Sequence, residues 1–577
     1  MQSSYNITTS PASQHPIIDK EQPVNSETVC DSTPVKNNEP NREDLSCPQV
    51  PWVGSNGLDD TNREMEHEYI TGFKLLIVML AVTLVCFIMM LDMSIIVTAI
   101  PQITSDFHSL SDVGWYGSVY LLTNCTLQPL AGKVYSNFNT KYIFLIFLGV
   151  FELGSILCGA AQSSNMLIVG RAVAGLGGSG LANGALTVIS ASVPIYKRPA
   201  MMGVMMSVSQ LGIVCGPLIG GALTQFASWR WCFYINLPIG GLSLIFLLLI
   251  KVPNSRSTAA SISTLKMVSR KLDLIGFTLF APFAIMLLLA LEWGGSEYAW
   301  SSATVIGLFC GSGGALTVFA AWEYYVGDEA MIPFSMVKKR IVWSSCLVLA
   351  FASASMFILT YYLPIYFQAV KGVSPTLSGV YLLPGILPQM ITAYISGVLV
   401  GKTGYYLPWI VTSTILMAIA SGLLSTLALD TPTAKWVGYQ ILIGVGRGSG
   451  MQMPIIAIQN VLPAVQIPIG MSVVVFSQTL GGAVFLTVTQ LIFNRSLISG
   501  LNQFAPTVDP QIVLSAGVTA IRKLVKIDEV PGVLKAFSWA INKDFYLAAG
   551  VSVVAFVLSW GMGWQSIKMK KVVGPGA

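Results

Sequence analysis

Long apolar runs limit what this chain can fold into more than any other feature. We count fourteen, each close to the roughly 20 residues that an α-helix needs to cross the bilayer core. Backbone polar groups find no partner in lipid, so such runs cross as helices and predict an all-α polytopic membrane protein. The predicted spans are residues 74–97, 114–134, 142–162, 166–190, 200–223, 231–250, 273–292, 302–322, 342–366, 376–399, 407–428, 435–457, 469–491 and 545–565.

Composition excludes several other classes of protein. Charged residues make up 10% of the chain, against about 25% in soluble proteins. No basic stripe with interleaved aromatic residues is present, so we expect no nucleic-acid partner. The nine cysteines and three histidines form neither a CxxC pair nor a ligand cluster, so we predict no metal site. The sequence has no GxxxxGK[ST] motif and no catalytic cluster, so neither ATP-driven transport nor an enzyme is indicated.

The distribution of lysine and arginine predicts the orientation. With the N-terminus inside, the inner connections hold basic clusters at residues 197–198, 270–271 and 338–340. The short outer connections hold only Arg230, Lys371 and Lys435. Short basic connections stay on the cytosolic side, so we expect both termini in the cytosol.

Two pairs of similar segments indicate related halves. Residues 175–180 are similar to residues 444–450, and residues 209–212 are similar to residues 477–481. Both pairs lie about 270 residues apart, as an internal repeat requires. Transporters built from repeats bind their substrate between the halves.

Residues 170–221 combine a lone arginine with many glycines. A charge within an apolar span is costly unless it is paired or faces a polar cavity, so Arg171 marks a functional site. Small residues let helices approach closely in lipid. The stretch ends in a segment that contains Gly212, Gly216, Pro217, Gly220 and Gly221. We interpret it as part of a moving transporter core.

Several motifs along the chain together point to a known family. The first covers residues 91–101, which begin with the sequence LDMS and end with AIP. The second consists of Gly170, Arg171 and Gly175, and the third is the glycine-proline segment 212–221. The fourth is a loop motif with Gly132, Lys133 and Lys141. In this order they resemble the first-helix, fourth-helix, fifth-helix and loop motifs of the fourteen-span drug:proton antiporter branch of the major facilitator superfamily. Ser136 stands near the position where the family usually has an acidic residue. Residues 151–155, 293–295 and 361–368 are most similar to fungal members that export toxins and secondary metabolites.

The resemblance implies a major facilitator fold of two six-helix bundles plus two linking helices, which makes fourteen transmembrane helices. The expected parts are a disordered cytosolic tail at 1–70, an N-terminal bundle at 71–252, linking helices with flanking cytosolic loops at 253–340, a C-terminal bundle at 341–565 with an outer loop at 492–544, and a cytosolic tail at 566–577. It also implies alternating access driven by proton entry. The segment 212–221 is then a bend that seals a leak path, with close helix packing as the alternative.

Proton coupling needs a carboxylate whose surroundings change during transport. Asp92, Glu152 and Arg171 are the charged residues that lie well inside the predicted spans of the first half, away from the span ends. Burial disfavours the charged form of a carboxylate, and a nearby arginine favours it. We predict that these three residues couple proton entry to transport. The alternative is a static ion-pair network that holds the bundle together.

A cavity for amphipathic molecules needs aromatic surface and a few polar groups. The candidate substrate contacts are Asn124, Gln128, Gln210, Tyr361, Tyr366, Gln368, Gln389, Arg447, Gln452 and Gln478. Hydrogen bonding between helices is the alternative role for each of them. Asn494 begins a glycosylation sequon on the predicted outer side.

These observations predict a proton-coupled exporter of hydrophobic or amphipathic small molecules, such as a fungal toxin, secondary metabolite or drug. Its expected partners are its small-molecule substrate and the lipid bilayer, as a monomer, with no cofactor beyond the proton gradient. We expect the plasma membrane, with a vacuolar or vesicle membrane as the alternative. A siderophore or nutrient carrier of the same architecture and a transporter-derived sensor are the alternative functions.

Overall fold

The computed structural model describes residues 69–109, 112–250, 271–295, 297–510, 513, 526 and 528–568. The described residues form helices joined by connections, with two isolated β-bridges and no β-strand among them. Most of the predicted N-terminal tail 1–70, and residues 569–577 of the predicted C-terminal tail, lie outside the described residues.

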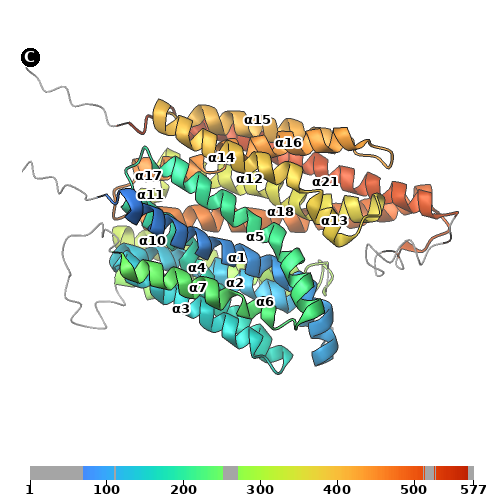
Figure 1. Cartoon of the computed structure of the whole chain (residues 1–577), viewed down its shortest axis with the longest axis horizontal. Helices are drawn as coiled ribbons and strands as arrows, with labels where there is room; N and C mark the ends of the chain where they lie inside the picture. Colours follow the sequence, from blue (N-terminus) through green and yellow to red (C-terminus); the bar gives the residue numbers. More distant parts are fainter. Residues whose placement is uncertain are drawn as a thin grey trace, which may run out of the picture. The chain divides into compact units, whose positions relative to one another are not determined.

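The first half begins at α1 and contains six long helical segments (Figure 1). They are α1 (Gly72–Phe107), α2 (Val113–Asn137), α3 (Thr140–Gly159), α4 (Ser164–Ser192), α5 (Arg198–Phe226) and the pair α6 (Trp231–Tyr234) and α7 (Asn236–Leu249). Side-chain caps begin two of them. Asn139 accepts a hydrogen bond from the backbone of Lys141, and Ser163 accepts one from Met166, so donors at the starts of α3 and α4 are satisfied.

Two linking helices follow, α9 (Leu274–Trp293) and α10 (Ala303–Val326), which pack on each other. Asp273 caps α9 through the backbone amide of Gly276 and also accepts hydrogen bonds from Trp322 Nε1 and the amide of Met331, both at 2.9 Å. One buried carboxylate thus fixes the start of α9 against α10 and the segment after it. The short α11 (Phe334–Val337) leads to the second half.

The described part of the second half again contains six helical segments. They are α12 (Arg340–Ile365), α13 (Pro375–Val380) with α14 (Leu383–Thr403), α15 (Leu407–Leu424), α16 (Thr433–Gly450) with α17 (Met453–Val461), α18 (Ile467–Phe504) and α21 (Val530–Ser559). Within the predicted outer loop 492–544, the structure shows helix at both ends, because α18 continues to Phe504 and α21 begins at Val530. Residues such as Phe537 and Ile541 bury the first turns of α21 in the core.

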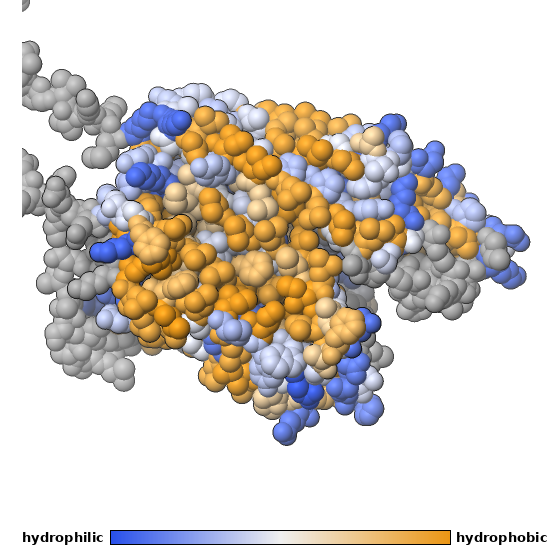
Figure 2. Space-filling view, viewed as in Figure 1, coloured by the Kyte–Doolittle hydropathy of each residue, from blue (hydrophilic) through white to orange (hydrophobic). Residues whose placement is uncertain are grey.

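Thirteen helical segments of the described chain are long and apolar enough to cross a membrane. They match thirteen of the predicted spans. The exception is the second span, because α2 has 25 residues and is long enough but is not among the helices that are apolar enough. Asn124, Gln128 and Lys133 make α2 more polar. Because α2 packs against α4, α18 and α9, this polarity is turned largely toward protein. Figure 2 shows a broad hydrophobic band across the middle of the visible face, as a surface in lipid requires.

The two halves repeat one packing scheme. In the first half α1 packs on α5 and α4 packs on α2 and α3, while in the second α12 packs on α18 and α16 packs on α14 and α15. The halves meet where α2 packs on α18 and where α5 packs on α14. This arrangement leaves two seams between the halves, each made by a pair of helices.

Glycines set the distance between α1 and α5. A Cβ added at Gly212 would meet the backbone of Phe87 and Leu91, and one added at Gly216 would meet Ser94 and Ile95. Pro217 lies inside α5, which the structure describes as helical from Arg198 to Phe226. Gly212 and Gly216 therefore allow the backbones of α5 and α1 to approach closely.

Replacing Gly216 by leucine should destabilise the protein, because the side chain has to displace α1. Overpacking typically costs about 1–3 kcal/mol. The matched control is Gly221→Leu on the same helix, where an added Cβ meets nothing within 4 Å. Thermal unfolding of the purified variants should show a lower Tm for Gly216→Leu alone. Equal losses in both variants would contradict this packing argument.

Candidate functional site

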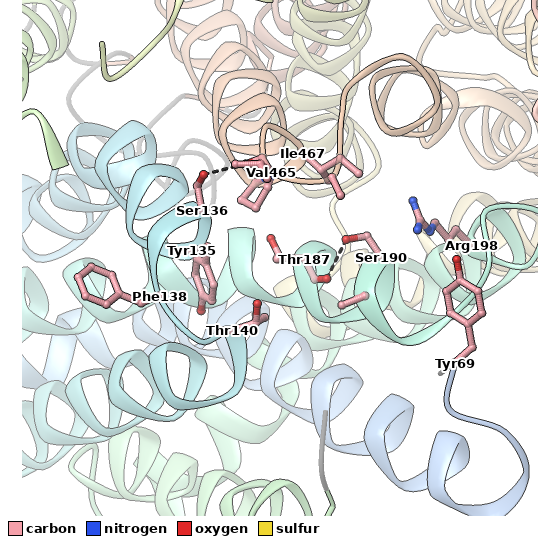
Figure 3. A pocket seen from close by; sticks show the side chains of 13 residues that line it. Tyr69, Tyr135, Ser136, Phe138, Thr140, Thr187, Ser190, Arg198, Val465 and Ile467 are labelled. Carbon is pink, nitrogen blue, oxygen red and sulfur yellow. Dashed lines mark hydrogen bonds between the residues drawn. The ribbon is translucent and has the colours of Figure 1, made fainter. Parts of the chain in front are cut away.

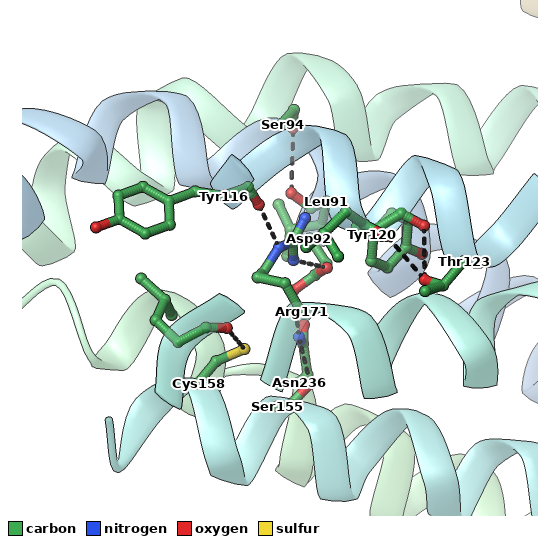
Figure 4. Close-up of polar contacts among 12 residues, drawn as sticks. Leu91, Asp92, Ser94, Tyr116, Tyr120, Thr123, Ser155, Cys158, Arg171 and Asn236 are labelled. Atoms are coloured by element: carbon green, nitrogen blue, oxygen red, sulfur yellow. Dashed lines mark hydrogen bonds and ion pairs between the residues drawn. The ribbon is translucent and has the colours of Figure 1, made fainter. Parts of the chain in front are cut away.

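A buried ion pair lies at the centre of the first half. Arg171 of α4 donates from Nη1 to Asp92 Oδ2 of α1 at 2.5 Å (Figure 4). The exposed fractions of the two side chains are 1% and 0%. Sequence analysis singled out both residues, and the structure brings them together although 79 positions separate them. Each charge removes most of the cost of burying the other.

Helix α2 holds the arginine in place. Arg171 Nε donates to the carbonyl oxygen of Tyr116 at 2.9 Å, and the guanidinium lies 4.6 Å from the centre of the Tyr120 ring. A cation over an aromatic face is stabilised by the ring quadrupole. The arginine therefore joins α4 to both α1 and α2.

Asn236 of α7 forms a hydrogen bond with the second carboxylate oxygen of Asp92. Its Nδ2 donates to Asp92 Oδ1 and to Ser155 Oγ, both at 3.1 Å. The Asn236 side chain is fully buried, and its own oxygen has no hydrogen-bond partner among the described residues. One amide thus connects Asp92 to helix α3 (Figure 4).

Glu152 lies on α3 one turn before Ser155. Both carboxyl oxygens are buried, and neither has a hydrogen-bond partner among the described residues. A Cβ added at Gly240, one turn after Asn236, would clash with this carboxyl group, so the glycine makes room for it. An isolated buried carboxylate is costly and the neutral acid is much less so, which suits a group that holds a proton.

The sequence did not indicate Asn236, Tyr116 or Tyr120. A single amide at the start of an apolar run was the only available signal for Asn236. Asp544 of α21 was also missed, because the last span was predicted to begin at residue 545. It is fully buried, and neither carboxyl oxygen has a partner in the described part of the chain.

The loop-motif residues do not converge on one site. Gly132 packs against Ser472 of α18, where a Cβ would clash. Lys133 Nζ donates to the carbonyl oxygens of Glu329 and Ala330 at 2.8 and 2.6 Å, after the linking helices. Lys141 Nζ donates to the carbonyl oxygens at the end of α7. The motif therefore ties the end of α2 and the start of α3 to three separate elements.

The two halves pack closely at one end of the helices. We call the end that carries Lys133, Lys197 and Lys402 the basic end. There Ser136 Oγ donates to the carbonyl oxygen of Val465 at 2.7 Å. On the other seam, a Cβ added at Gly397 of α14 would clash with the backbone at Pro199 of α5. Both seams are thus closed near the basic end.

A cavity of about 170 Å³ remains at this end, between the halves (Figure 3). The first half contributes Tyr135 and Ser136 from α2, Thr187 and Ser190 from α4, and the buried Arg198. The second half contributes residues between 464 and 468. Its walls come from both halves, so the cavity exists only while they are together.

The predicted cavity residues separate into two groups. Tyr366 Oη donates to the carbonyl oxygen of Ala428 at 2.7 Å, and Gln452 Nε2 to that of Ala393 at 2.9 Å, so both serve helix packing. Gln128 donates to Asn124 within α2. No side-chain hydrogen bond to another described residue is recorded for Gln210, Tyr361, Gln368, Gln389 or Gln478. The half-buried Arg447 donates to the carbonyl oxygen of Met356.

Two other features bear on the predictions. Asn494 lies inside helix α18 and is half-buried, whereas glycosylated asparagines lie on surface loops. Among the residues that the structure describes, no group of three or more His, Cys, Asp or Glu side chains is placed to hold a metal ion.

Comparison with known proteins agrees with this architecture. The profile of the Major Facilitator Superfamily matches residues 82–486. The chain is 57% identical over 539 residues to the efflux pump mlcE of Penicillium citrinum, covering 92% of this chain and 97% of that protein. It is 55% identical over 500 residues to the MFS-type transporter pigP of Monascus ruber, covering 87% of this chain and 88% of that protein.

Solved structures show the same fold at low sequence identity. The human organic anion transporter MFSD10 aligns with a TM-score of 0.55 and 12% identity, covering 85% of this chain and all of that one. The proton:xylose symporter XylE aligns with a TM-score of 0.53 and 14% identity, covering 86% of this chain and 97% of that one. The observed helices, the two similarly packed halves and the relatives lead to the same conclusion. This multi-pass membrane protein belongs to the major facilitator superfamily.

Proposed function

We propose that this protein exports hydrophobic or amphipathic small molecules, such as a fungal secondary metabolite or toxin, in exchange for protons. The observation that carries the proposal is the buried Asp92–Arg171 pair with the unpartnered Glu152 carboxyl group nearby. Two carboxyl groups in one dry region, of which one is held by an arginine, form a site that can load and release a proton. The relative mlcE, named an efflux pump, supports export as the direction.

Protonation of Asp92 would remove the charge that holds Arg171. The arginine would keep the Tyr116 carbonyl and the Tyr120 ring as partners, and its contact with Asp92 would weaken from an ion pair to a hydrogen bond with a neutral acid. A neutral aspartic acid beside Asn236 also changes the link to α3 and Glu152. Protonation of Asp92 would thereby change how these helices pack.

Helix α5 connects this change to the basic end. Ser94, two residues after Asp92, donates to the carbonyl oxygen of Gly212 on α5 at 3.2 Å. Farther along α5, Gly203 contacts the carbonyl oxygen of Ala393 on α14, in the other half. A shift of α1 is therefore passed by α5 to the seam between the halves, which supports alternating access by rigid-body movement.

The positive-inside rule supports an orientation with the basic end and both termini in the cytosol. In that orientation the structure is closed toward the cytosol. We propose the plasma membrane as its location and a monomer as the working unit.

Neutralising either carboxyl group should abolish proton-driven export. Asp92→Asn leaves Arg171 without its counter-charge, and Glu152→Gln removes the second proton acceptor. Export of whichever dye the unaltered protein exports, fluorescein or rhodamine 6G, should be measured in vesicles with an imposed pH gradient, with protein in the membrane quantified. Glu297→Gln, at an exposed turn, is the matched control and should export normally. Undiminished export from both site variants would contradict the coupling proposal.

A disulfide across the basic end should arrest transport. Ser136→Cys with Val465→Cys places two thiols where the halves touch. Oxidation of the double variant should stop dye export, because the basic end can no longer open, and reduction should restore it. Each single variant should be insensitive to oxidation. If the cross-linked protein forms in full and still exports, opening at this end is not part of the cycle.

A further inference from the structure

Arg447 of α16 is a half-buried cation with an incomplete set of partners. Nη2 donates to the carbonyl oxygen of Met356 on α12 at 3.2 Å. Nε is buried and has no hydrogen-bond partner among the described residues. A guanidinium has five N–H donors, so one backbone carbonyl satisfies a small part of it.

Arg171 shows a better-partnered arginine in the same protein. It has a carboxylate, a carbonyl oxygen and an aromatic ring around it. Within the described ranges, the recorded ion pairs are Arg171–Asp92 and Arg230–Asp106, and neither includes Arg447. A charge at membrane depth without a counter-charge is costly and is retained where function requires it.

The packing of α16 gives the direction in which Arg447 points. Gly444 and Gly448 face the backbone of α14 around Gln389, and Gly446 and Gly450 face α15. Arg447 lies between these two faces and reaches α12. The residue as a whole is half-buried, whereas its Nε is fully buried beside α12.

Polar side chains lie on the neighbouring helices. Gln389 is one turn before Ala393, whose carbonyl oxygen meets α5 of the first half. Gln478 of α18 is one turn before Gly482, which packs on Phe357, next to the residue that Arg447 contacts. No hydrogen bond of either amide to another described side chain or carbonyl is recorded. Two amides thus lie on α14 and α18, the second-half helices that form the seams.

We infer that the exported molecules carry an anionic oxygen group, such as a carboxylate, and that Arg447 binds this group with Gln389 and Gln478 orienting the rest. The inference rests on the export function proposed above and adds the chemical class of the cargo. A guanidinium matches a carboxylate with two parallel hydrogen bonds, which an ammonium cannot provide in the same geometry. A bond to the Met356 carbonyl alone needs only a neutral donor and does not explain a charge.

Two dyes with one xanthene ring system and opposite charge test the inference. Export of fluorescein, an anion, and rhodamine 6G, a cation, should be compared in vesicles that contain the full chain. Arg447→Gln should lower the ratio of fluorescein to rhodamine export rates by about tenfold, the equivalent of one lost charge-assisted bond. Arg447→Lys should give an intermediate ratio. Arg340→Gln, an exposed arginine at the start of α12, should leave the ratio unchanged.

An unchanged ratio in Arg447→Gln would overturn the inference. If Arg447→Gln does not reach the membrane, Arg447→Lys decides, since a lowered ratio supports the inference and an unchanged ratio overturns it. Rhodamine export by the unaltered protein without any fluorescein export would overturn the anionic cargo and leave the export function standing. If the unaltered protein exports neither dye, the result would count against both the anionic cargo and the export function.

Discussion

The buried pair of Asp92 and Arg171 is the interaction on which the arrangement of the first half depends. Neither charge is tolerable alone in a dry helix bundle, and together they connect α1, α2, α4 and α7 through Tyr116 and Asn236. Buried pairs contribute little net stability, because desolvation offsets the attraction. What the pair provides is a packing arrangement that holds only while the carboxylate keeps its charge.

Small residues make that arrangement movable. Glycines on α5 let it lie directly on α1, and glycines on α14 and α16 bring backbones together in the second half. Such contacts are rigid within a half. At the seams between the halves, close contacts such as Gly397 with Pro199 lie beside hydrogen bonds such as that of Ser136 with Val465, and hydrogen bonds of this kind exchange readily with water. The structure thus combines two stiff bodies with an interface that can separate.

Much of the fold followed from the sequence, because apolar runs must become helices in lipid. The predicted spans correspond to observed helices, and Arg171 and Asp92 were identified from the cost of a charge within a span and from the motifs that contain them. What the sequence could not provide was the partner of each charge. Asn236 is 144 positions from Asp92, and nothing in a linear pattern indicates that they meet. The same holds for Asp544, which lies before the most apolar part of α21 and is buried by tertiary packing.

Distances across the basic end test the central claim that the charge on Asp92 controls the conformation. Spin labels at Lys197 and Lys402, which are exposed on opposite halves, would report them in a cysteine-free background. At neutral pH the account predicts short distances, and in Asp92→Asn it predicts a shift to longer distances without any substrate. A distance distribution that stays the same in Asp92→Asn and at low pH would contradict the account.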